Sequence, residues 1–118
     1  TDNPAGRLSL ALDMVRMNPS QTLLVWDLAM LLDEQSMHRD ALRWYQQAQA
    51  TYQLTQPGQT LPADFLLDMA TSQLHAGLMD SAEKILQQVI TRQGDLPRAH
   101  RVMARLMKST SRTDEARR

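Results

Sequence analysis

Apolar and small residues recur along the chain at spacings of three and four, the period of an amphipathic α-helix. The pattern predicts helices that include residues 41–52 and 81–92, and a helix that begins at Pro97. Asp80 and Glu83 have the spacing of a capping box, and Gly94 follows the last apolar residue of the second helix as a stop signal. Ala and Leu, the strongest helix formers, are abundant and β-branched residues are sparse, so we expect an all-α fold.

A skeleton of small residues occurs three times along this pattern. In each copy two adjacent apolar residues precede a small turn residue and then an alanine. The copies are Leu28-Ala29, Ser36 and Ala41; Met69-Ala70, Gly77 and Ala82; and Met103-Ala104, Ser111 and Ala116. The second and third copies are 34 residues apart, and the first precedes the second by 41.

This skeleton predicts a pair of antiparallel helices in close contact. A small residue in the middle of one helix and another early in the next allow the two helices to approach closely. Gly77 in the turn between them can take a positive φ, and the large side chain of Tyr45 or Leu86 fills the space one turn further on. Such a pair cannot bury its apolar surface alone, so we expect neighbouring pairs to stack.

The spacing resembles the tetratricopeptide repeat (TPR), and the resemblance covers most of the chain. It implies a right-handed superhelix of antiparallel helix pairs, an α-solenoid. The implied organisation is a single segment with five parts: a second helix of a partial repeat at 5–17, a repeat at 22–52, an insertion at 53–62, a repeat at 63–96, and a truncated repeat at 97–118 with the start of a second helix.

The sequence departs from the repeat pattern in two places. Gln73 stands where the family usually has an aromatic residue. Residues 53–62 add about seven positions between two repeats and contain Pro57-Gly58 and Pro62, which favour a turn. Either the preceding helix continues into this segment and then turns, or a loop bulges there.

Composition and charge limit the classes of partner. The chain has no Cys, which removes disulfides and zinc–thiolate sites, and no apolar run long enough to span a membrane. Its formal net charge is zero, so we expect no nucleic-acid partner. The charge is unevenly distributed: residues 1–90 carry five Lys/Arg and ten Asp/Glu, whereas residues 91–118 carry eight and three. Because the chain begins at Thr1 and shows no signal peptide, we expect it to be part of a longer protein.

We expect no catalytic residue, metal site or cofactor. His38, His75 and His100 are isolated from one another, and the adjacent pair Asp33-Glu34 points in different directions on a helix. There is no Gly-rich phosphate loop. Lone histidines of this kind are more often packed or solvated than functional.

Four cations lie on one stripe of the last helix, at spacings of three, four and three: Arg98, Arg101, Arg105 and Lys108. Two interpretations stay open. The stripe is either a solvated face near a helix C-terminus, where cations are favoured, or an anion-binding strip for acidic side chains of a partner. The apolar stripe opposite is expected to pack inward, and it comprises Ala99, Val102, Met103, Leu106 and Met107.

The TPR resemblance implies a concave groove lined by the first helix of each repeat. The partner-binding positions it implies are Trp26, Met30, Asp33, Asp64, Leu67, Thr71, His75, Arg98, Arg101, Arg105 and Lys108. Trp26 has two interpretations, since it either fills the core or serves as an exposed anchor for a partner.

A finer resemblance rests on the run QLTQPGQTLPADFLLDMATSQLHAGLMDSAEKIL. It is similar to the periplasmic TPR region of bacterial outer-membrane exopolysaccharide exporters, most of all those of the Pel type. This resemblance implies a periplasmic, non-catalytic scaffold that recruits a polysaccharide deacetylase or hydrolase and supports export of the biofilm matrix, with weak contact to the polysaccharide itself.

Two alternatives are a bacterial TPR adaptor for an acidic peptide or protein, with a cytoplasmic location, and a structural spacer. Self-association through exposed end helices is a further expectation, because a solenoid end leaves apolar surface uncovered.

Overall fold

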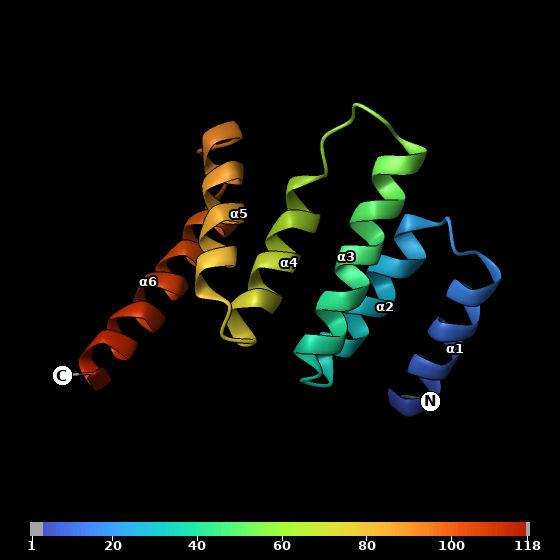
Figure 1. Cartoon of the computed structure of the whole chain (residues 1–118), viewed down its shortest axis with the longest axis horizontal. Coiled ribbons are helices and arrows are strands. Elements are labelled where there is room, and N and C mark those ends of the chain that lie inside the picture. The colour runs from blue at the N-terminus through green and yellow to red at the C-terminus, as the bar shows by residue number, and fades with distance from the viewer. Residues whose placement is uncertain (1–3, 118) are drawn as a thin grey trace. The chain divides into compact units, whose positions relative to one another are not determined.

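The computed structural model describes residues 4–117, and the side chains of residues 5–111. Within this range the chain is all-α and contains no strand, which confirms the predicted all-α class. The helices are α1 (Pro4–Met17), α2 (Thr22–Glu34), α3 (His38–Thr55), α4 (Ala63–His75), α5 (Met79–Arg92) and α6 (Pro97–Arg117) (Figure 1). No helix among the described residues is long and apolar enough to cross a membrane.

The chain divides into two compact units. Unit 1 is Thr1–Leu61 and contains α1, α2 and α3, whereas unit 2 is Pro62–Arg118 and contains α4, α5 and α6. The first of the two alternatives for residues 53–62 is the one observed, because α3 continues to Thr55 before the chain turns. Gly58 takes a φ of +83° in the loop that follows, as a glycine readily does.

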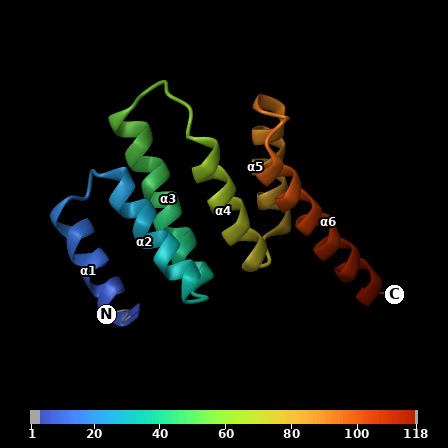
Figure 2. The ribbon, with the colours of Figure 1, turned by 180° about the vertical axis from the view of Figure 1, so that it is seen from behind.

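In unit 1 the core lies between α2 and α3, which form an antiparallel pair (Figure 1). Ala29 and Ala41 are fully buried, and their small side chains allow the two helices to approach closely. Leu28 and Tyr45 are also buried and fill the space between them. Full burial of a leucine contributes roughly 1.5–3 kcal/mol. Seen from behind, α1 lies beside α2 (Figure 2).

The turn between α2 and α3 is tight. The backbone N–H of Met37 donates to the carbonyl of Leu32 at 2.9 Å, and Ser36 takes a φ of +61°. These are the features of a helix end closed by a residue in the left-handed conformation. The turn is compact because Ser36 adopts a backbone conformation that glycine takes more easily.

Unit 2 repeats this arrangement with α4 and α5. Ala70 and Ala82 are buried where the helices meet, and Gly77 has a φ of +85°. The N–H of Leu78 donates to the carbonyl of Gln73 at 2.8 Å, which closes α4 as Met37 closes α2. Helix α6 then packs on α5 and α4 through buried Ala99, Val102 and Leu106.

Three details differ from the predicted boundaries. Helix α5 begins at Met79, and its N-cap residue is Leu78 with no side-chain cap, so the predicted capping box at Asp80 is wrong. The left-handed Gly77 already fixes where the new helix starts, and Asp80 lies in its first turn, where a negative charge is favoured.

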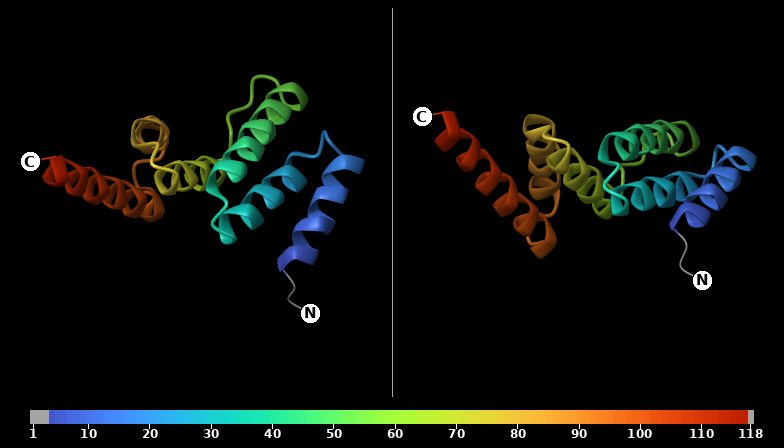
Figure 3. Two further views of the ribbon diagram at one scale, coloured as in Figure 1. Left: turned by 60° about the horizontal axis from the view of Figure 1, so that its bottom comes forward. Right: turned by 90° about the horizontal axis from the view of Figure 1, so that it is seen from below.

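The other two differences concern α6. It is one unbroken helix to Arg117, so the turn and second helix expected around Ser111 do not form (Figure 3). Residues 109–113 contain neither Gly nor Pro, and nothing in their sequence interrupts the helix. Met107 is 63% exposed and Met103 is only half-buried, although both were expected to pack inward.

Candidate functional site

The candidate site is a cleft between α4 and α6 in unit 2. It has a volume of about 230 Å³. We call it the arginine cleft, and the residues that line it are Thr71 of α4 and Arg98, Arg101, Val102 and Arg105 of α6. The helical period places the three arginines on one stripe of α6. Buried Val102, Ala99 and Leu106 on the neighbouring stripe anchor the helix to unit 2.

Arg98 is held in place by two carboxylates of α4. Its Nη2 donates to Oδ1 of Asp68, and its Nη1 lies 3.5 Å from Oδ1 of Asp64. The side chain of Asp68 is 15% exposed, whereas that of Asp64 is largely solvated. The ion pair with Asp68 is therefore the better shielded from solvent screening, and it fixes Arg98 against α4.

Arg101 and Arg105 differ from Arg98 in their surroundings. Both are exposed, and neither forms an ion pair with a carboxylate among the residues that the structure describes. They lie one helical turn apart and both line the cleft. The positive charge at this position is therefore uncompensated within the described part of the chain.

The remaining lining residues do not add donors. The hydroxyl of Thr71 donates to the carbonyl of Leu67 at 2.8 Å, so its proton is not available to an anion in the cleft. Val102 is buried and apolar. Any anion in the cleft would therefore be bound by guanidinium groups, which match the planar, two-oxygen geometry of a carboxylate.

The structure brings together five of the residues predicted for the groove: Asp64, Thr71, Arg98, Arg101 and Arg105. Leu67 lies on the same helix but is buried, so it presents no surface to a partner. His75 is exposed at the last position of α4, and Lys108 is exposed further along α6. Neither of these two lines the cleft.

The predicted groove residues of unit 1 have a different environment. Asp33 accepts from Tyr45, whose hydroxyl lies 3.1 Å from Oδ2, and its Oδ1 lies 2.8 Å from Nδ1 of His38. Asp33 therefore connects the end of α2 to α3. Trp26 is half-buried, so its burial does not decide between a core residue and an exposed anchor. Met30 is 41% exposed.

Two residues of the site were not predicted from the sequence. Asp68 is the carboxylate that positions Arg98, and Val102 was expected in the core but also forms part of the cleft. A signal for Asp68 was present, because Asp64 and Asp68 lie four residues apart and so share one face of α4. Nothing in the sequence indicates that this face meets α6, 30 residues further on.

Among the described residues no group of three or more His, Asp or Glu is arranged to hold a metal ion. The arginine cleft presents two exposed cations, Arg101 and Arg105, whose chemistry suits an anionic ligand.

A comparison with models of protein families gives no match to this chain, and a comparison with curated proteins gives none either.

Proposed function

We propose that this chain is a helical-repeat scaffold of the tetratricopeptide type that binds another protein and performs no catalysis. The observation that carries the proposal is the pair Arg101 and Arg105, which line a cleft and have no carboxylate partner among the described residues. An acidic segment of a partner protein would supply the missing carboxylates. Such pairs of opposite charge guide association and set specificity.

The cation stripe was interpreted either as a solvated face or as an anion-binding strip, and its residues differ in their surroundings. Arg98 is used inside unit 2 by Asp64 and Asp68 and serves to fix α6 on α4. Arg101 and Arg105 are then presented on a helix that is already held in place, so binding an acidic side chain there requires no ordering of the backbone. We assign anion binding to these two residues and a positioning role to Arg98.

The resemblance to exopolysaccharide exporters supports a more specific form of this proposal. In that setting the chain is a periplasmic part of an outer-membrane exporter, and the acidic partner is the polysaccharide deacetylase or hydrolase. A cationic polysaccharide would be repelled by Arg101 and Arg105, which favours a protein as the ligand of the cleft. Fractionation of the full-length protein tests the location, and recovery with cytoplasmic markers would contradict it.

The test of the binding site uses a fluorescently labelled oligo-glutamate peptide as the probe. Its anisotropy is titrated with wild-type chain and with a double variant, Arg101→Glu with Arg105→Glu, at low ionic strength. The two exchanges turn attraction into repulsion, and we expect affinity to fall about tenfold, which corresponds to about 1.4 kcal/mol. An oligo-lysine peptide should not bind to the cleft.

Unit 1 offers a matched control. Arg39 and Arg43 are both exposed on α3 and are also four residues apart, so Arg39→Glu with Arg43→Glu makes the same change in charge at the same spacing. If both double variants weaken the binding equally, the probe senses only net charge and the cleft is not the site. The same variants are then tested against the purified deacetylase or hydrolase. Binding of the peptide without the enzyme would support a general adaptor, and binding of neither would support a spacer.

A further inference from the structure

The two carboxylates that contact Arg98 differ in how well they are shielded from water. The side chain of Asp68 is 15% exposed, and it accepts from Nη2 of Arg98. The side chain of Asp64 is 79% exposed, and its Oδ1 lies 3.5 Å from Nη1, beyond the usual hydrogen-bond range of about 2.7–3.2 Å. Because solvent screens an exposed ion pair and leaves a shielded one stronger, the contact with Asp64 is the weaker of the two.

The nitrogen in this weaker contact belongs to a residue of the arginine cleft. Arg98 lines the cleft together with Arg101 and Arg105, and its side chain is 38% exposed. At about 1.5 Å per residue, the three arginines extend over about 10 Å of the α6 axis. One carboxylate cannot contact guanidinium groups over that length, whereas a segment that carries several carboxylates can contact all three.

We propose that Asp64 is an internal competitor for the acidic ligand of the arginine cleft. Its carboxylate pairs with Nη1 of Arg98 when the cleft is empty, and an acidic segment replaces it and binds Arg98 as well as Arg101 and Arg105. The contact of Nη2 with Asp68 persists, so Arg98 keeps its positioning role and adds a third donor to the cleft. This inference rests on the proposed function, because it requires that Arg101 and Arg105 bind an anion.

This competition makes the cleft selective for clustered acidic side chains. Asp64 is part of the same unit as Arg98, so its effective concentration at Nη1 is high and a ligand with a lone carboxylate does not displace it. A segment already bound to Arg101 and Arg105 presents its next carboxylate at a comparable effective concentration, and a guanidinium matches the two oxygens of that carboxylate. Asp64 therefore determines how many acidic groups a partner needs, and the partner class is a segment with carboxylates spread over about 10 Å.

The helices do not depend on Asp64 for their packing. Helix α6 is anchored in unit 2 by buried Ala99, Val102 and Leu106, and the contact of Arg98 with Asp68 is separate from the contact with Asp64. Exchange of Asp64 for asparagine keeps the size of the side chain and removes its charge. We therefore expect Asp64→Asn to retain the helix signal in circular dichroism.

The first test measures the affinity of the labelled oligo-glutamate peptide for wild-type chain and for Asp64→Asn, at low ionic strength. Removal of the competitor should raise the affinity about threefold, the scale of one exposed ion pair. An unchanged affinity, with wild-type binding still weakened by Arg101→Glu with Arg105→Glu, overturns this inference and leaves the proposed function standing. Absence of binding by both wild type and Asp64→Asn overturns the two together.

Helix α5 offers a matched control for the change in charge. Asp80 is the second residue of α5, as Asp64 is of α4, and it is exposed and forms no ion pair among the described residues. Asp80→Asn removes the same charge from the same position of a helix, away from the cleft. It should leave the affinity for the peptide unchanged. An equal gain in Asp80→Asn would assign the effect to net charge and contradict a competitor at Arg98.

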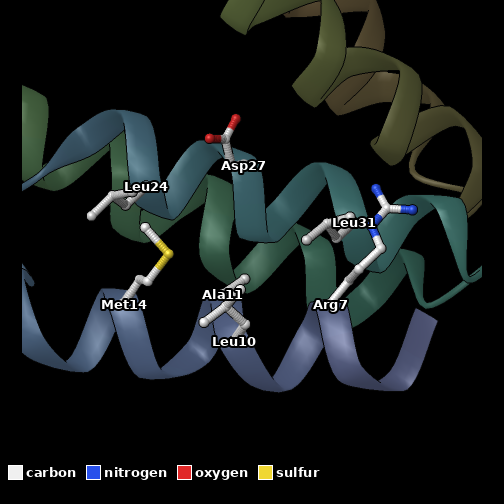
Figure 4. A pocket seen from close by; sticks show the side chains of 7 residues that line it. All are labelled: Arg7, Leu10, Ala11, Met14, Leu24, Asp27 and Leu31. Carbon is white, nitrogen blue, oxygen red and sulfur yellow. The ribbon is translucent and has the colours of Figure 1, made fainter. Parts of the chain in front are cut away.

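Unit 1 offers a second control, in which an arginine loses its carboxylate outside the cleft. Arg7 lines a mainly apolar groove between α1 and α2 (Figure 4), and its Nη2 lies 3.7 Å from Oε2 of Glu34. Arg7 is the one cation among the described residues that line this groove, so Glu34→Gln releases a guanidinium with no second arginine beside it. Glu34→Gln should therefore not raise the affinity. A gain equal to that of Asp64→Asn would mean that the peptide binds any released arginine.

A double-mutant cycle separates competition for Arg98 from simple repulsion of the peptide by Asp64. Arg98→Gln with Asp68→Asn removes the guanidinium and the carboxylate that holds it, so net charge is unchanged and no shielded carboxylate loses its cation. In this background Asp64→Asn should give no further gain, because the nitrogen that it releases is absent. A gain that stays about threefold would show that Asp64 acts only through its charge, and would overturn the proposal. The comparison of Asp64→Asn with Asp80→Asn decides the matter where this background lowers the helix signal, since both of those residues are exposed.

Discussion

Ser36 and Gly77 occupy the same position in two helix pairs, and both have a positive φ. A serine in the left-handed conformation is less stable than a glycine, because its Cβ approaches the following carbonyl oxygen. A Cβ added to Gly77 would meet no atom within 4 Å, so the difference between the two residues lies in the backbone and not in packing. The chain therefore contains its own comparison of the two residues at one turn.

We expect Ser36→Gly to raise the free energy of unfolding by about 0.5–1 kcal/mol, because the strain relieved exceeds the added entropy of the unfolded chain. Gly77→Ala should lower it by about 1 kcal/mol. Urea unfolding followed by circular dichroism measures both. Ser20→Gly is the control, since Ser20 lies in a turn without a positive φ, and it should give no gain. A gain from Ser20→Gly equal to that from Ser36→Gly would rule out the backbone explanation.

Side chains of single residues also account for what the sequence did not predict. Asp33 was expected to face a partner, but its carboxylate binds Tyr45, twelve residues away, and His38. Asp68 holds Arg98 across 30 residues, and the sequence does not pair the two. A helical period states which face of a helix a residue lies on. It does not show which residue of another helix meets that face, so these pairs could not be predicted from the sequence.

At the scale of elements, the helix pairs were predictable because the small-residue skeleton records a contact between two helices. Ala29 with Ala41, and Ala70 with Ala82, are buried as that skeleton requires. The end of α6 was not predictable in the same way. Ser111 matches the turn position of the other pairs, yet a turn forms only where a second helix packs back on the first, and α6 continues instead.

The pair of α4 and α5 contains one polar defect, at Gln73. This side chain is buried, and its Oε1 has no hydrogen-bond partner among the described residues. The matching position in α2 is Leu32, which is buried and apolar. A buried acceptor without a partner costs about 1–3 kcal/mol, because it has lost its hydrogen bonds to water.

We expect Gln73→Met to raise the free energy of unfolding by about 1 kcal/mol, because methionine keeps the unbranched shape and removes the buried carbonyl. The control is Gln46→Met on α3, where the glutamine is exposed and the change should stay within about 0.5 kcal/mol. Urea titration at an unchanged slope reports the difference. A loss of stability in Gln73→Met would mean that the amide has a structural role in the α4–α5 pair.

At the scale of the whole molecule, the charge asymmetry was visible in the sequence and its consequence depended on the structure. The excess of positive charge after residue 90 belongs largely to α6, where Arg98 is used internally and Arg101 and Arg105 are not. The division into two units was also only partly predictable. The turn-rich insertion at 53–62 indicated an interruption, and the boundary of the units at Leu61 and Pro62 lies within it.

This division predicts the course of limited proteolysis. Residues 56–60 are exposed and outside any helix, and they form the longest such stretch between α1 and α6. A protease of broad specificity such as subtilisin binds its substrate as an exposed segment in an extended conformation. Exposed loops are therefore cut first. We expect the first cut at residues 56–61, giving two fragments of similar mass that mass spectrometry identifies.

The nicked protein should keep its helix signal, because each unit has its own buried residues: Tyr45 and Leu28 in unit 1, and Leu86 and Val89 in unit 2. Circular dichroism before and after the cut measures this directly. A first cut in the α2–α3 turn at residues 35–37 would show that the strained Ser36 turn opens more readily than the loop. Loss of most of the helix signal after a cut at 56–61 would show that neither unit is stable without the covalent connection, in which case the chain unfolds as a single cooperative body.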